Sequence, residues 1–83
     1  MIFLYTTSTC SKCVAVADWL AGHEIPFEPR VIDTDAEAMA DALMLGAYSC
    51  PALVNGAMLL TPRDIFRAGR IDEERILELA RGK

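Results

Sequence analysis

The apolar residues of this chain fall into short runs separated by polar turns, and their spacing changes along the chain. A short continuous apolar run is typical of a buried strand, and apolar spacings of three and four residues are typical of a helix. The pattern predicts the order β-α-β-α-β-β-α. The predicted elements are a strand at 1–6, a helix from 11 that ends at Gly22, a strand at 26–33, a helix at 34–46, a hairpin at 51–61, and helical segments at 61–69 and 72–83 with a break at Gly69.

Capping and apolar residues define the second predicted helix. Asp35 or Thr34 is placed to cap its N-terminus, because short polar side chains can accept the first free N–H groups of a helix. Met39 and Leu43, together with Ala42, recur at helical spacing and are expected to form its apolar face.

The predicted hairpin and the segment after it carry strong local signals. Asn55-Gly56 is a favoured hairpin turn pair. Thr61 is placed as an N-cap, with Pro62 as the first helical residue and Asp64 three residues after the cap.

The element order predicts an α/β fold with a four-stranded mixed sheet flanked by helices, in one domain over residues 1–83. A right-handed β-α-β unit makes the first two strands parallel, and the hairpin adds two antiparallel strands. Pro29 lies in the second predicted strand and favours an edge position, because proline lacks the N–H that a central strand needs. Helices are expected to cover both faces of this sheet.

Charge and hydropathy exclude several classes of function. The net charge is −4 with a pI near 4.7, and no basic cluster is present in the sequence, which argues against nucleic acid and anionic membranes as partners. The sequence has no apolar run of about 18 residues, so we expect no membrane span. The opening residues MIFLYT are short and lack a basic leader, so we expect no signal peptide and a cytoplasmic location, where thiols are kept reduced.

Cys10 and Cys13 form a C-x-x-C pair at the junction of the first predicted strand and helix. Such a pair can be a redox dithiol, half of a metal site, or two buried small residues. The strand-to-helix position favours the redox role. A free thiol has a pKa near 8.5, and the dipole of a helix N-terminus contributes only about 0.3–1 kcal/mol, so the N–H groups of Lys12 and Cys13 are expected to hydrogen-bond a Cys10 thiolate.

Three segments carry a resemblance to a known family: LYTTSTCSKC at 4–13, CPALVNG at 50–56 and TPRDIF at 61–66. Together with the element order, they are similar to small glutaredoxin-like redoxins of the thioredoxin superfamily, closest to the NrdH type. The resemblance implies a minimal thioredoxin/glutaredoxin fold, and a thiol–disulfide oxidoreductase in which Cys10 attacks and Cys13 resolves.

The same resemblance implies where partners dock. It implies a cis peptide bond at Pro51, facing the cysteines, and a substrate surface at the loop of Tyr48, Ser49 and Cys50. Lys12 adds a positive charge beside the pair, and we expect Lys12 and Pro51 to bind the substrate together with that loop.

This chain also departs from the glutathione-using members of the family. Such relatives carry a Gly-Gly pair with an acidic residue after the hairpin, and often a Lys before the first cysteine, whereas this chain has AMLLTPRDIF and Thr-Thr-Ser-Thr at 6–9. Electrons are therefore expected to come from a thioredoxin reductase-like protein rather than from glutathione, with no cofactor in the protein itself. The resemblance points to a disulfide-containing protein such as ribonucleotide reductase as the target.

A metal-binding or iron–sulfur carrier module is the competing class of function. If the fold is as predicted, Cys50 lies beside Cys10 and Cys13, and three sulfurs converge. His23, the only histidine, lies at the far end of the first predicted helix and is a poor fourth ligand. Cys50 could otherwise be a third redox thiol or a buried small residue.

Overall fold

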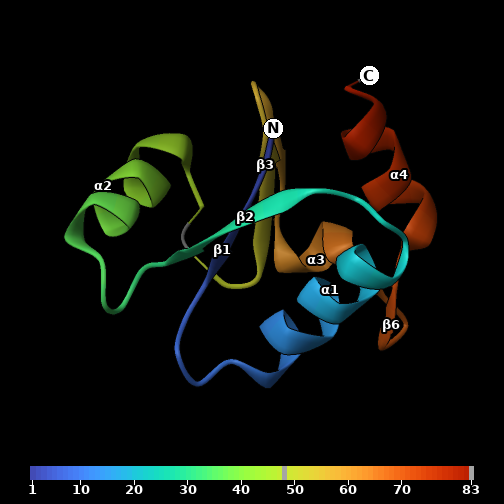
Figure 1. Cartoon of the computed structure of the whole chain (residues 1–83), viewed down its shortest axis with the longest axis horizontal. Helices are drawn as coiled ribbons and strands as arrows, with labels where there is room; N and C mark the ends of the chain where they lie inside the picture. The colour runs from blue at the N-terminus through green and yellow to red at the C-terminus, as the bar shows by residue number, and fades with distance from the viewer. Residues whose placement is uncertain (48, 83) are drawn as a thin grey trace.

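The structure, a computed structural model, describes residues 1–47 and 49–82 (Figure 1). Its four-stranded sheet has the order β2-β1-β3-β4, and a separate two-stranded hairpin has the order β5-β6. The elements are β1 Ile2–Thr6, α1 Ser11–Gly22, β2 Phe27–Val31, α2 Ala36–Leu45, β3 Ala52–Asn55, β4 Met58–Leu60, α3 Pro62–Ile65, β5 Phe66–Arg67, β6 Arg70–Ile71 and α4 Glu73–Arg81.

The sheet has the predicted mixed pairing. β1 pairs parallel with β2 and antiparallel with β3, and β3 pairs antiparallel with β4. β2 is an edge strand, as the proline at position 29 predicts, because its unpaired side needs no ladder N–H from Pro29. The α/β class with a four-stranded mixed sheet is confirmed.

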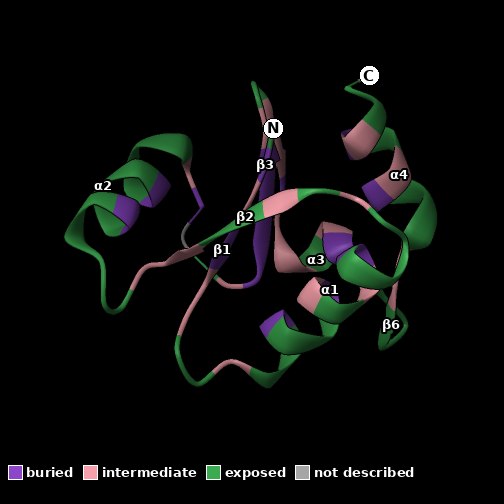
Figure 2. Ribbon diagram, in the orientation of Figure 1, coloured by how far each residue is buried: buried purple, intermediate pink, exposed green. Residues whose placement is uncertain are grey.

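Helices cover both faces of the sheet, with α1, α3 and α4 on one side and α2 on the other (Figure 1). The alternation along β1 divides the core in the same way. Ile2 and Leu4 pack with the buried residues of α1, α3 and α4, while Phe3 and Tyr5 pack with those of α2 (Figure 2). None of the helices in the described ranges is long and apolar enough to cross a membrane.

The predicted apolar face of α2 is confirmed for Ala42 but wrong for Met39 and Leu43. Ala38 and Ala42 are buried against the sheet, whereas Met39 and Leu43 are 39% and 54% exposed. Small side chains let the helix backbone approach the sheet closely, so the alanines rather than the bulkier residues face the core. The cap prediction resolves to Asp35, whose carboxylate accepts the N–H groups of the second and third helical residues.

The predicted hairpin turn is displaced by one residue. Asn55 pairs with Met58 across β3 and β4, so Gly56 and the next residue form the turn, with Gly56 at φ +63°. The Asn55 side chain instead donates from Nδ2 to the Leu79 carbonyl at 2.7 Å, and this bond ties the end of β3 to α4.

The helix predicted at 61–69 is also wrong beyond its first turn. Its start is confirmed: the Asp64 carboxylate accepts the N–H of Thr61, and Pro62 is the first helical residue. α3 ends at Ile65, however, and the chain turns back through Ala68 (φ +53°) and Gly69 (φ +76°). Two consecutive residues with positive φ form a tight hairpin turn that matches strand twist, so β5 and β6 replace the expected helix.

Candidate functional site

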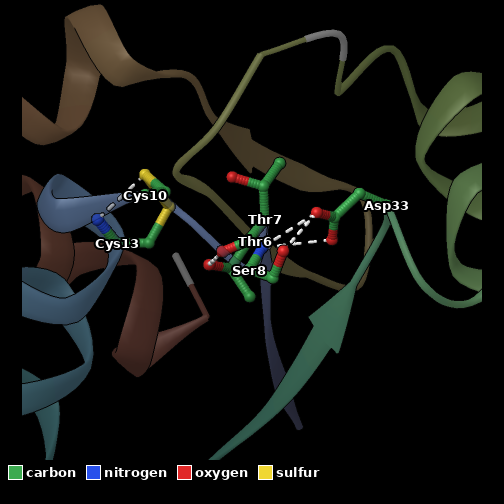
Figure 3. Close-up of a disulfide and its surroundings, with 6 residues drawn as sticks. All are labelled: Thr6, Thr7, Ser8, Cys10, Cys13 and Asp33. Carbon is green, nitrogen blue, oxygen red and sulfur yellow. Dashed lines mark hydrogen bonds between the residues drawn. A yellow bond between two sulfur atoms is a disulfide. The ribbon is translucent and has the colours of Figure 1, made fainter.

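The C-x-x-C pair lies at the N-terminus of α1, where the chain leaves β1. Cys10 is the N-cap residue, with extended backbone angles (φ −93°, ψ 105°), and Cys13 lies in the first helical turn. The two cysteines form a disulfide with a Cα–Cα distance of 5.3 Å (Figure 3). A capping residue and a residue three positions later lie on the same side of the helix end, which brings the two sulfurs together.

The two cysteines differ in exposure. Cys13 is only 2% exposed, whereas Cys10 is half-buried. Cys10 Sγ accepts a hydrogen bond from the Cys13 backbone N–H at 3.2 Å (Figure 3). This N–H is one of the groups that an α-helix leaves without an internal acceptor, so it is available to a negatively charged sulfur.

Within the described ranges, Lys12 does not make the hydrogen bond to Cys10 that was expected of its backbone N–H. In this part of the chain, its backbone N–H makes no bond to the disulfide-bonded Cys10 Sγ, and the Cys13 N–H does. The bonds expected to a Cys10 thiolate stay a prediction. The exposed Lys12 side chain reaches toward β5, and its Nζ lies 5.6 Å from the centre of the Phe66 ring. A cation–aromatic contact of this kind contributes about 0.5–1 kcal/mol at an exposed site.

A contact between Ser8 and Asp33 holds the loop before Cys10. The Asp33 carboxylate accepts the Ser8 N–H at 3.1 and 3.2 Å and the Ser8 hydroxyl at 2.5 Å (Figure 3). The hydroxyl bond from Ser8 is the main reason that the pKa of Asp33 lies below its ordinary value of 3.8. The loop that leads to Cys10 is thereby tied to the end of β2.

Sequence reasoning missed this contact, although a signal was available. Thr6 pairs with Val31 in the parallel register of β1 and β2. Ser8 and Asp33 each lie two residues beyond that pair, at the edge where parallel strands end together. A serine and an aspartate that each follow the last paired residue of neighbouring parallel strands by the same number of positions therefore predict such a bond.

The Cys50–Pro51 segment has the geometry that the resemblance implies. The peptide bond between Cys50 and Pro51 is cis, and Pro51 is buried while Ser49 is exposed. Cys50 is a half-buried free thiol, and its pKa is raised above 9.0, first by burial and then by the negative charge of Asp33. Tyr48, the remaining residue of the predicted substrate loop, lies outside the described residues.

The three-sulfur metal hypothesis finds no matching arrangement of ligands. Within residues 1–47 and 49–82, no three His, Cys, Asp or Glu side chains gather as a group that could hold a metal ion. His23 stacks on Trp19, with ring centres 4.0 Å apart, and its Nδ1 lies 2.9 Å from the Trp19 carbonyl oxygen at the far end of α1. It serves the end of this helix rather than the cysteines.

Comparison with known proteins agrees with this arrangement. The sequence profile of the glutaredoxin family matches residues 2–57. The crystal structure of the thioredoxin-like protein BC3987 is 24% identical, covering 95% of this chain and 99% of its own, with a TM-score of 0.77. The crystal structure of a mutant of that same protein is 22% identical over 95% of this chain and 97% of its own, also with a TM-score of 0.77.

The glutaredoxin from Archaeoglobus fulgidus is also similar. Its crystal structure is 26% identical, covering 98% of this chain and 86% of its own, with a TM-score of 0.70. A comparison with curated protein sequences found no match. The similar structures support the fold, and the family profile covers the first strand, the cysteine pair and the CPALVNG segment, but ends before TPRDIF at 61–66.

Proposed function

This chain belongs to the glutaredoxin family, and on that premise we propose that it is a dithiol electron donor that reduces disulfides in other proteins. Family and geometry together support thiol–disulfide oxidoreductase chemistry at Cys10 and Cys13. The proposal adds the direction of electron flow, the role of each cysteine and the class of partner.

The proposed reaction has two exchange steps. The Cys10 thiolate attacks one sulfur of the partner disulfide, forms a Cys10–partner mixed disulfide and releases the other partner sulfur as a thiolate. Cys13, after losing its proton, attacks Cys10 Sγ, which closes the Cys10–Cys13 disulfide and releases the second partner thiolate. The partner gains two electrons and takes up two protons, and the pair is left oxidised.

The observation that carries this assignment is the difference in exposure. A protein disulfide can approach half-buried Cys10 but not Cys13, which is 2% exposed. The Cys13 N–H donates to Cys10 Sγ, so the more accessible sulfur is also the one with a donor for its negative charge. Cys13 lies within bonding reach of Cys10 and can resolve the mixed disulfide without a large movement of the backbone.

The electron donor in this proposal is a thioredoxin reductase-like protein rather than glutathione. Where glutathione-using relatives have a Gly-Gly pair, this chain has the start of α3, in which Pro62 follows Thr61 and the Asp64 carboxylate is bonded to Thr61. Asp64 is therefore engaged by the protein itself. The similarity to NrdH-type redoxins supports ribonucleotide reductase as the target and the cytoplasm as the place of action.

The partner surface in this proposal is the cis-proline loop. Ser49 and Cys50 precede buried Pro51, and β3 begins directly after it, opposite Tyr5 near the end of β1 from which the chain runs to the cysteine pair. The proposed surface includes Tyr48, which precedes Ser49 in the sequence, and Lys12, which lies two residues after Cys10. An extended partner segment would lie against the loop while its disulfide faces Cys10.

Trapping the mixed disulfide tests the mechanism. A Cys13→Ser protein incubated with a disulfide-containing protein should accumulate a covalent adduct that dithiothreitol releases, because nothing resolves it. The Cys10→Ser protein is the matched control and should form no such adduct. Both variants also carry Cys50→Ser, so that Cys50 cannot capture the partner. No adduct through Cys10, or an adduct of equal yield through Cys13, contradicts the assignment.

Turnover assays with different electron donors test the proposed partner class. Insulin disulfide reduction is measured with NADPH and thioredoxin reductase, and separately with NADPH, glutathione reductase and glutathione. We expect faster turnover with thioredoxin reductase. Faster turnover with glutathione would contradict a protein reductase as the donor, while leaving the oxidoreductase chemistry intact.

A further inference from the structure

The β5–β6 hairpin, residues 66–71 and here termed the arginine hairpin, lies beside the N-terminus of the active-site helix. Lys12, two residues after Cys10, places its Nζ 5.6 Å from the centre of the Phe66 ring at the start of β5. The proposed chemistry does not use this hairpin, and the sequence pattern predicted a helix in its place.

The two faces of the arginine hairpin have opposite characters. Phe66 and Ile71 form one cross-strand pair and pack against the core. Arg67 and Arg70 form the other pair, and both are exposed. Because successive side chains of a strand alternate between its faces, the two arginines share the outer face.

This pair of arginines is unfavourable for the hairpin on its own. Like charges directly opposite each other in an antiparallel pair are destabilising. The turn that places them there contains Ala68 in a left-handed conformation (φ +53°), which is also costly for a residue with a Cβ. The turn itself serves folding, because it lets Phe66 and Ile71 pack against the core. The exposed arginines take no part in that packing, so folding alone gives no reason for two facing arginines at this point.

Within residues 1–47 and 49–82, no ion pair neutralises the positive charges of Lys12, Arg67 and Arg70. In the described ranges, ion pairs within 4 Å involve Arg30 and Arg75 and none of Lys12, Arg67 and Arg70. Asp64 is taken by Thr61 and Arg75, and the Asp72 carboxylate accepts the N–H of Arg75 as the cap of α4. In the part of the chain that the structure describes, Lys12, Arg67 and Arg70 thus have no ion-pair partner although the net charge of the chain is −4. The contact between Lys12 and the Phe66 ring links the arginine hairpin to the start of α1.

We propose that the arginine hairpin, together with Lys12, docks an acidic segment of the partner protein next to the disulfide that Cys10 reduces. This rests on the proposed function and names the class of partner: proteins with carboxylates flanking the reactive disulfide. Two guanidinium groups on one face offer paired N–H donors that match carboxylate geometry. Because the groups are exposed, they act mainly on the rate of association and lose their effect as salt screens them.

Two synthetic peptides test the proposal. Each contains one intramolecular disulfide, and they differ only in three Glu or three Gln residues beside it. We measure the rate at which the reduced protein reduces each peptide under second-order conditions. At low ionic strength the Glu peptide should react about five- to tenfold faster, and the preference should fall toward one in about 0.5 M salt.

Charge-matched variants locate the effect. An Arg67→Gln/Arg70→Gln protein and an Arg81→Glu protein are both two units more negative than the natural chain. Arg81 is exposed near the end of α4, which lies at the opposite end of the molecule from the start of α1 (Figure 1). The first variant should lose most of the preference for the Glu peptide, and the second should retain it. An Arg67→Lys/Arg70→Lys protein should retain most of it, because it keeps both charges.

The Gln peptide separates the two proposals. If the Gln peptide is reduced, the disulfide-reductase function stands. The docking proposal is then overturned if the natural chain shows no preference for the Glu peptide. It is also overturned if Arg81→Glu abolishes the preference as fully as the double substitution does. If neither peptide is reduced, the proposed function fails, and the docking proposal fails with it. Circular dichroism of each variant verifies that it is folded, as expected for substitutions at exposed positions.

Discussion

The bond between Asn55 and Leu79 allows a stability prediction in which both sign and size follow from the structure. Asn55 Nδ2 donates to the Leu79 carbonyl at 2.7 Å, which joins β3 to α4 across 24 residues of sequence. The same carbonyl also accepts the Gly82 N–H at 3.0 Å. An Asn55→Ala substitution therefore removes one hydrogen bond without leaving the carbonyl unpaired, and should lower the free energy of unfolding by about 0.5–1.5 kcal/mol.

An Asn55→Asp substitution should cost more than Asn55→Ala, although it conserves the shape of the side chain. It removes the donor and places a carboxylate against the C-terminal turn of α4, which carries about half a negative charge. At about 4 Å and an effective dielectric constant between about 20 and 80, that repulsion is about 0.5–2 kcal/mol. Added to the lost bond, the total decrease in the free energy of unfolding is about 1–3.5 kcal/mol.

Urea unfolding followed by the fluorescence of Trp19, the only tryptophan, measures both variants. A loss of about 1 kcal/mol corresponds to about 4–8 °C in Tm for a domain of this size. The carboxyl group introduced by Asn55→Asp can donate to the carbonyl when it is protonated, so its pKa in the folded state is raised. At each pH, the free energy of unfolding of Asn55→Asp is compared with that of the natural chain. The additional loss should be present at pH 7 and decrease as the pH falls through the raised pKa. If Asn55→Asp is as stable at pH 7 as Asn55→Ala or more stable, the electrostatic argument is refuted.

The loop and hairpin geometry leads to three further predictions. Because the Ser8 hydroxyl lowers the pKa of Asp33, an NMR titration should place the Asp33 midpoint below 3.8. Ser8→Ala should raise that midpoint, and an identical midpoint in the variant and the natural chain would exclude the bond in solution. The contact therefore contributes to stability at neutral pH and is lost as the pH falls through the lowered pKa. Burial and the charge of Asp33 raise the pKa of Cys50, so iodoacetamide should modify Cys50 slowly at pH 7.5 in a protein whose Cys10–Cys13 disulfide is intact. An Asp33→Asn variant should react faster, and equal rates would contradict a charge effect. Ala68→Gly should raise the free energy of unfolding by about 0.5–1 kcal/mol, because glycine adopts a positive φ without strain, and a urea midpoint that falls would contradict the hairpin turn.

The features that sequence reasoning predicted correctly depend on residues close together in the chain. The start of α1 at the cysteine pair, the Asp35 cap and the edge position that Pro29 favours all follow from local chemistry. Capping and proline effects act within a few residues, so their signals survive without knowledge of the rest of the molecule. The glutaredoxin family is recognisable for the same reason, since its motifs are short and regularly spaced.

The features that required the tertiary structure depend on contacts between distant residues. Which face of α2 is buried is decided by how closely that helix approaches the sheet, and the alanines allow a closer approach than Met39 and Leu43 do. The local pattern predicts a helical segment as far as residue 69, but Phe66 and Ile71 pack onto the core only if the chain folds back as a hairpin. Local pattern thus places the cysteine pair, whereas long-range packing brings Asp33 to the loop before it and pairs Arg67 with Arg70, because burial and charge proximity are set by the whole fold.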